Sequence, residues 1–279
     1  MTNEIFHINN AVKSGVPQET LNLLNSTINI KETNVSIKEG NIILPFALFL
    51  IMIVFIILYS NSAVNDIAYL KTNRVMEIFS TSTKTLPLYL GVNMAAVLVP
   101  VIQIILTGVC AGIASIAMNI DFASIENSVG INFDSLCIDK LVVYIVLLIL
   151  GYFIYSFIST SVVSIVSKVE DVTSIAVPIA MIGLVQYFIG MIALEGDSLI
   201  LKVFSYIPLT SPSIMFLRYA VGYAELWEAL ISISILVLTV CVLAFLGSSL
   251  FSKGVSYYGN IKEFFSSNLN TNQGEKYGN

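Results

Sequence analysis

The sequence predicts an all-α membrane protein with about five membrane-spanning helices. The chain has 279 residues, and only 11% of them are charged, whereas soluble domains carry about 25% charged residues. The mean hydropathy is +0.87, far into the apolar range. Long apolar runs alternate with short polar segments, and a run of roughly 20 residues is enough for a helix to cross a bilayer. We therefore expect a multi-pass protein of the cell membrane.

Composition and residue types exclude several functions. The formal net charge of −5 and the lack of a basic stripe exclude nucleic acid as a partner. His7 is the only histidine, so neither a His-metal cluster nor a Ser-His or Cys-His dyad can be assembled among the spans. There is no G-x-x-x-x-G-K-[ST] phosphate loop. We expect no enzyme and no metal or other cofactor in this chain, so ATP hydrolysis would fall to another polypeptide.

Five apolar runs are the candidate spans. The second is longer than one crossing needs and contains Pro100, which fits a tilted or kinked helix. Together the runs define a transmembrane domain over residues 42–252, with a polar segment at 1–41 before it and a polar tail at 253–279 after it. The spans are residues 42–62, 86–118, 140–166, 172–193 and 229–251.

The stretch before the last span contains two apolar pieces that are too short to cross. Pro208 and Pro212 separate LILKVFSYI from SIMFLRYAVGY. As helices these pieces would reach only about 14 to 17 Å. The sequence therefore predicts two short helices that are interfacial or re-entrant.

Charge near the spans sets the predicted orientation. The loop 119–139 carries four acidic and no basic residues before Lys140, so we expect it outside the cell. Segment 61–85 and the tail are then cytoplasmic, and segment 1–41 is external. Since that external segment has no signal to carry it across, we expect an earlier span to be missing from this chain. The basic residues on the two sides are Lys71, Arg74, Lys84, Lys168 and Lys253, against Lys38, Lys140, Lys202 and Arg218.

The cytoplasmic segment Asn61–Thr85 is the one compact polar stretch between two long apolar runs. Read as a helix, it collects apolar side chains on one face. Such a helix can lie along a membrane or dock in a partner's groove, while the alternative is an ordinary solvated loop. The apolar residues on that face are Val64, Ile67, Ala68, Val75, Ile78 and Phe79.

Uncharged polar residues within the spans allow two interpretations. On the third span Ser156, Thr160 and Ser164 repeat every four residues, and Gln103 lies on the second span. They could line a transport pathway. The favoured alternative is close helix packing with hydrogen bonds between helices. Because no carboxylate, Lys or Arg lies well inside the predicted spans, a proton-relay transporter is disfavoured.

Two motifs resemble those of the permease subunits of ABC-2 type exporters, and within them the sodium-efflux-like permeases. The first is NRVMEIFSTSTKTLPLYLG and the second is PLTSPSIMFLRYAVGYAELWEA, in order and roughly 130 residues apart. The chain departs from that family's pattern near Tyr69 and Leu70, where an acidic residue is often found, and at Val92, where a Lys is often found. The matching residues are Arg74, Met76, Glu77, Ile78, Thr81 and Ser82, then Pro208, Ser211, Pro212, Met215, Arg218, Gly222, Trp227 and Glu228.

The resemblance implies a type V exporter-like fold. Its cytoplasmic coupling helix would press on a separate ATP-binding subunit, which holds the ATP and Mg, through Arg74, Met76, Glu77, Ile78 and Phe79. The short helices, with Pro208, Ser211, Pro212, Met215 and Arg218, would form the external gate.

By the same resemblance, a second permease copy or paralogue would complete the unit. Sodium ions, drugs or peptides are the implied cargo, and segment 1–41 would be the remnant of an extracellular domain. The alternative is a non-transporting membrane scaffold or a partial permease from a split gene.

Overall fold

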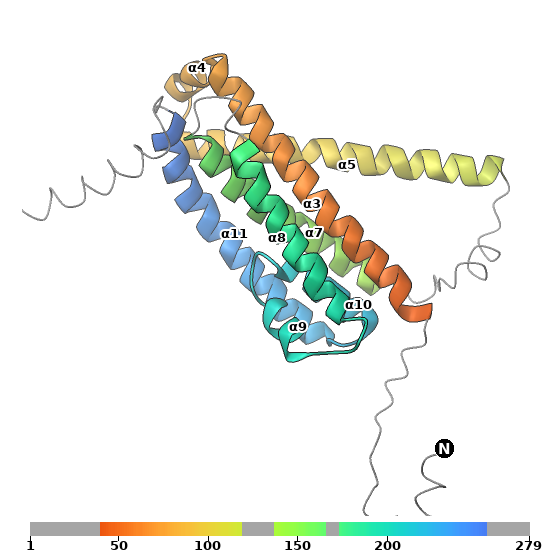
Figure 1. The fold of residues 1–279 in the computed structure, drawn as a ribbon. Coiled ribbons are helices and arrows are strands. Elements are labelled where there is room, and N and C mark those ends of the chain that lie inside the picture. Colours follow the sequence, from red (N-terminus) through yellow and green to blue (C-terminus); the bar gives the residue numbers. More distant parts are fainter. Residues whose placement is uncertain (1–39, 119–136, 166–172, 256–279) are drawn as a thin grey trace, which may run out of the picture. The chain divides into compact units, whose positions relative to one another are not determined.

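The structure is a computed structural model that describes residues 40–118, 137–165 and 173–255. Within this part of the chain every regular element is a helix (Figure 1). The order is α3 (Gly40–Thr72), α4 (Val75–Ser82), α5 (Thr85–Ala117), α7 (Ile138–Val163), α8 (Thr173–Ile192), α9 (Leu199–Phe204), α10 (Ser211–Val221) and α11 (Leu226–Val255).

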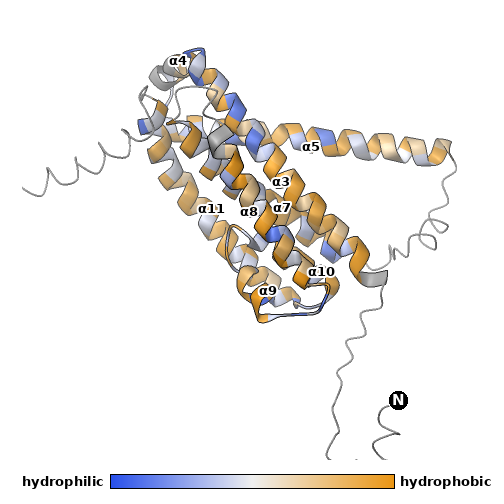
Figure 2. Ribbon diagram, in the orientation of Figure 1, coloured by the Kyte–Doolittle hydropathy of each residue, from blue (hydrophilic) through white to orange (hydrophobic). Residues whose placement is uncertain are grey.

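The predicted class, an all-α membrane protein, is confirmed. In the described residues, α3, α5, α7 and α11 are long and apolar enough to cross a membrane, and α8 adds a shorter apolar stretch at Ala176–Ile192. Figure 2 shows apolar residues along most of these helices. Because α3 has 33 residues and rises about 1.5 Å per residue, it is longer than the hydrocarbon layer. A helix of this length extends beyond the apolar core of a bilayer, about 30 Å thick, at one end or at both.

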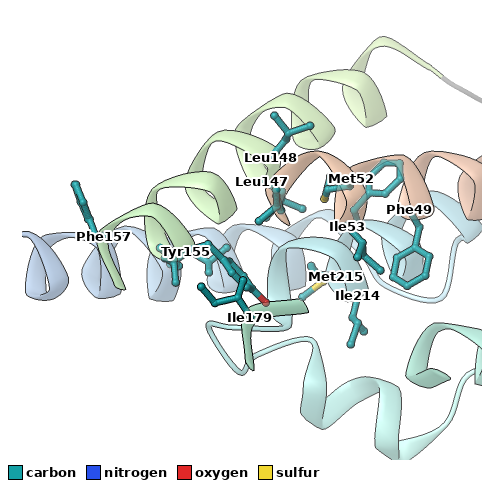
Figure 3. Packing of buried hydrophobic residues seen from close by; sticks show 14 of the residues in the cluster. Phe49, Met52, Ile53, Leu147, Leu148, Tyr155, Phe157, Ile179, Ile214 and Met215 are labelled. Atoms are coloured by element: carbon teal, nitrogen blue, oxygen red, sulfur yellow. The ribbon is translucent and has the colours of Figure 1, made fainter. Parts of the chain in front are cut away.

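Helix α7 lies at the centre of the bundle, with α3, α10 and α11 packed against it. Phe49 and Met52 of α3, Leu147 of α7 and Met215 of α10 belong to one cluster of buried apolar side chains (Figure 3). Close approach depends on small residues. A Cβ added at Gly151 would lie 2.7 Å from Ile56 Cδ1, closer than packed atoms allow. Small residues thus set the helix spacing where apolar lipid gives little drive for association.

Helix α5 has buried side chains only in its first half. Tyr89, Asn93, Ala96 and Pro100 are its buried residues, spaced to form one face. After Pro100 the side chains are exposed or half-buried, and in Figure 1 this second half extends away from the other helices. The chain continues as a helix through Pro100.

Segment 61–85 is not one amphipathic helix, which corrects the prediction made for it. The first span continues as α3 to Thr72, and the chain then turns at Asn73 and Arg74 before α4 begins. Arg74 makes this turn in the left-handed conformation, with φ 58°. The break separates the predicted apolar face. Its members on α3, Val64, Ile67 and Ala68, are buried, whereas Ile78 and Phe79 on α4 are exposed.

The two short helices before the last span are confirmed as α9 and α10. Every residue of α10 from Ser211 to Ala220 is buried, because α3, α7, α8, α9 and α11 surround it. This favours the re-entrant interpretation over one in which the helix lies on the membrane surface. Gly222, with φ 94°, ends α10, and the backbone N–H groups of Tyr223 and Ala224 return to the carbonyl of Arg218.

Several predictions lie outside the described residues. They concern the segment before residue 40, the loop 119–136, the turn at Lys168, Glu170 and Asp171, and the tail after Val255. The side of the membrane on which each end lies also stays a prediction.

Candidate functional site

The predicted coupling residues lie at one end of the bundle, where α4 connects α3 to α5. Helix α4 packs on α3, α5 and α11, and Met76 is its anchor, with no exposed surface. Ile78 and Phe79, in contrast, are 66% and 42% exposed. Met76 therefore cannot touch a partner directly, while Ile78 and Phe79 can.

The two charged coupling residues are differently placed. Arg74 immediately precedes α4, its side chain is exposed, and its backbone N–H donates to the carbonyl of Lys71 over 3.0 Å. The backbone of Glu77 is helical, but its side chain lies outside the described part of the chain. The structure thus defines the turn before α4 and a helical backbone at Glu77.

Lys71 is buried at this end, with 2% exposure. From the sequence it was expected only to be one of the basic residues on the cytoplasmic side. Its Nζ donates to the carbonyl of Gly254 over 2.9 Å and to the carbonyl of Ser164. Gly254 lies in the last turn of α11 and Ser164 directly follows α7 as its C-cap, and a helix leaves carbonyl acceptors unsatisfied at this end. The only sequence signal for this role is a lysine in the last turn of a span, which is too common to be specific.

The predicted gate residues gather around α9 and α10 at the opposite end from α4 (Figure 1). Arg218 is fully buried. Its Nε lies 3.3 Å from Asp197 Oδ1, its Nη2 lies 3.5 Å from Glu228 Oε2, and its Nη1 donates to Ser205 Oγ over 2.9 Å. One guanidinium thus joins the segment before α9, the end of α9 and the first turn of α11.

The remaining gate residues hold α10 in place. Ser211 Oγ lies 2.5 Å from Ser232 Oγ on α11, and Pro212, the second residue of α10, lies beside Gly151 of α7. Met215 is buried in the core and Pro208 is half-buried in the turn between the short helices. All five gate residues therefore belong to one packed unit.

A buried hydrogen-bond network, which the sequence did not reveal, joins α7, α8 and α10. The amide nitrogen of Gln186 lies 2.5 Å from Tyr155 Oη and donates to the carbonyl of Leu209 over 2.9 Å. The amide oxygen of Gln186 accepts from Ser213 Oγ over 2.5 Å. Helix α10 and the turn before it are thus fastened to α7 and α8 by uncharged polar groups.

The predicted pathway residues do not form one line. Ser156 and Thr160 both donate to Asn93 Oδ1 on α5, over 2.5 and 3.3 Å. Ser164 donates to a carbonyl of its own helix, and Gln103 accepts from Tyr59 Oη on an exposed face. For Ser156 and Thr160, this arrangement supports packing through interhelical hydrogen bonds. Among the residues described by the structure, no group of three or more His, Cys, Asp or Glu side chains could hold a metal.

The fold and these two ends define a multi-pass α-helical membrane protein with a short connecting helix at one end and two short helices, α9 and the buried α10, at the other. A family model described as "ABC-2 family transporter protein" matches residues 1–248. The chain therefore belongs to the ABC-2 transporter family.

Two curated relatives match the chain. The uncharacterized protein YhaP of Bacillus subtilis (strain 168) is 29% identical over 212 residues, which cover 75% of this chain and 50% of YhaP. The uncharacterized protein MJ1024 of Methanocaldococcus jannaschii is 29% identical over 111 residues, covering 39% of this chain and 28% of that protein. The chain spans at most about half the length of these relatives. No solved structure matches at a significant level.

Proposed function

We propose that the chain is the permease subunit of an ABC exporter, which moves its cargo out of the cell with energy from ATP hydrolysed by a separate ATP-binding subunit. The single observation that carries this proposal is the exposed apolar face of α4, on a helix that packs between membrane-spanning helices. Membership of a transporter family supports it. A second permease copy or paralogue would complete the transport unit.

Helix α4 suits the coupling role because its two sides differ. Buried Met76 and the adjoining spans anchor one side, whereas exposed Ile78 and Phe79 present apolar area on the other. Burying such a side chain in a groove of the partner would contribute roughly 1.5 to 3 kcal/mol. We propose that Arg74 and Glu77 set orientation and partner choice, since charges at an interface act mainly on specificity.

We propose that α9 and α10 form a re-entrant pair and that this pair is the external gate. It is packed among α3, α7, α8 and α11, so a displacement of these helices would move it. The ion pair between Arg218 and Glu228 connects it to α11, a helix that also packs against α4. Sodium ions, drugs or peptides are the cargo that we propose from the resemblance.

The test is co-expression of the chain with candidate ATP-binding subunits, followed by purification and ATPase assays. We expect Phe79→Ala to weaken assembly. Glu77→Ala should leave assembly intact but uncouple ATP hydrolysis from export. Ile231→Ala, at a side chain of α11 that is 43% exposed against 42% for Phe79, is the matched control and should change neither property.

Flux of candidate cargoes from vesicles then distinguishes transport from a scaffold role. ATPase activity that rises with one cargo, together with outward movement of that cargo, supports the proposal. A complex that assembles normally, yet never moves a cargo or changes its ATPase rate, would favour the non-transporting scaffold.

A further inference from the structure

We infer that Lys71 is a positioning residue that fastens the ends of α7 and α11 to α3, so that a movement of α4 passes to all three helices as one body. The inference deepens the proposed function and rests on it. It concerns the Lys71 junction, which we define as Lys71, Ser164 and Gly254.

Burial and bonding distinguish Lys71 from other basic residues at this end. Its side chain is 2% exposed, whereas Lys84 and Lys253 are exposed. A buried ammonium is expensive unless strong acceptors surround it. The carbonyls of Ser164 and Gly254 are such acceptors, because they lie at the negative ends of two helices.

The two helix ends also touch each other at the junction. A Cβ added at Gly254 would lie 2.2 Å from Ser164 Oγ and 2.8 Å from Ser164 C. The second distance involves backbone, which cannot rotate away as a side chain can. Gly254 therefore allows α7 and α11 to come close enough for one ammonium to reach both carbonyls.

The junction lies close to α4 along the chain. Lys71 lies in the last turn of α3, and only Asn73 and Arg74 separate that helix from α4. On the other side of α4, Thr85 Oγ1 donates to Ser252 Oγ of α11 over 3.3 Å. A displacement of α4 is therefore transmitted to α7 and α11 through short, hydrogen-bonded connections. A loose linker would absorb such a displacement.

Distance measurements between spin labels test the junction without any ATPase. The background replaces Cys110, Cys137 and Cys241, all exposed, by Ala. One label pair lies across the junction, at exposed Ser82 of α4 and exposed Ser249 of α11. The control pair lies at exposed Val142 of α7 and Leu230 of α11, away from α4.

We expect Lys71→Met to widen the distance distribution of the junction pair at least twofold and to leave the control pair unchanged. Lys253→Met, which removes an exposed charge beside Gly254, should change neither pair. An unchanged junction pair in Lys71→Met would overturn the inference. Equal widening of both pairs would also overturn it, because Lys71 would then act only on general stability.

Gly254→Ala keeps the lysine and disturbs the junction from α11. It should widen the junction pair as Lys71→Met does, and it decides the question if Lys71→Met does not give a folded protein. An unchanged junction pair in Gly254→Ala would then overturn the inference.

Once an ATP-binding subunit is found that the wild type stimulates, Lys71→Met should still bind it but lose at least fivefold in stimulation. Normal stimulation in Lys71→Met would overturn the inference. Failure of the wild type to stimulate any ATPase would instead overturn the proposed function, while leaving the distance results to judge the junction.

Discussion

Replacing Arg218 by Met should strongly destabilise the re-entrant pair. Methionine is also a long side chain, but it lacks the positive charge that faces Asp197 and Glu228. Removing one partner of a buried ion pair costs about 3 to 5 kcal/mol. The two carboxylates are only 22% and 19% exposed, so water relieves part of their desolvation, and we expect a loss at the lower limit, about 3 kcal/mol.

The assay is thermal unfolding of the detergent-solubilised protein. A loss of about 3 kcal/mol corresponds to a fall in Tm of about 6 to 12 °C for a domain of this size. Lys202→Met is the matched control, because Lys202 also pairs with Asp197, at 3.3 Å, but is 57% exposed. Exposed pairs contribute about 0 to 1 kcal/mol, so this variant should unfold near the wild-type temperature.

Arg218→Lys separates charge from geometry. Lysine keeps the positive charge but cannot reach Asp197, Glu228 and Ser205 together as the planar guanidinium does. Its Tm should fall between those of the wild type and Arg218→Met. Equal Tm values for Arg218→Met and Lys202→Met would refute the reasoning, since the buried network would then add nothing beyond an exposed pair.

Three further predictions concern other parts of the bundle. Asn93→Leu removes the acceptor shared by two hydroxyls of α7 and should lower stability by about 1 to 2 kcal/mol, while Gln103→Leu on the exposed face changes the Tm less. Gly247→Ala places a Cβ 2.3 Å from Tyr89 Oη and should cost about 1 to 3 kcal/mol; Gly108→Ala, with open space around it, should be neutral or stabilising, and equal Tm values would contradict the packing argument. Ser82→Cys in a background without native thiols should not react with an impermeant thiol reagent in intact cells, because α4 is predicted to be cytoplasmic. Reaction at this position would show that the predicted orientation of the chain is wrong.

The sequence alone determined the class and the order of elements. Apolar runs of sufficient length are local features, because a membrane-spanning helix satisfies its backbone hydrogen bonds within itself. Pro208 and Pro212 likewise marked the division into α9 and α10 locally. The packing interpretation of Ser156 and Thr160 also followed from spacing on one helix, and the structure supports it with Asn93 as their partner.

Only the tertiary structure decided which distant groups meet. Arg218 is recognisable in a motif, yet its joint contact with Asp197 and Glu228 depends on how α9, α10 and α11 pack. The same holds for Lys71, whose acceptors lie 93 and 183 residues further along the chain. Helices in a bilayer choose neighbours by close fit and interhelical hydrogen bonds, since their apolar surfaces suit lipid equally well. Hydropathy therefore shows where helices cross but carries little information on which faces come together.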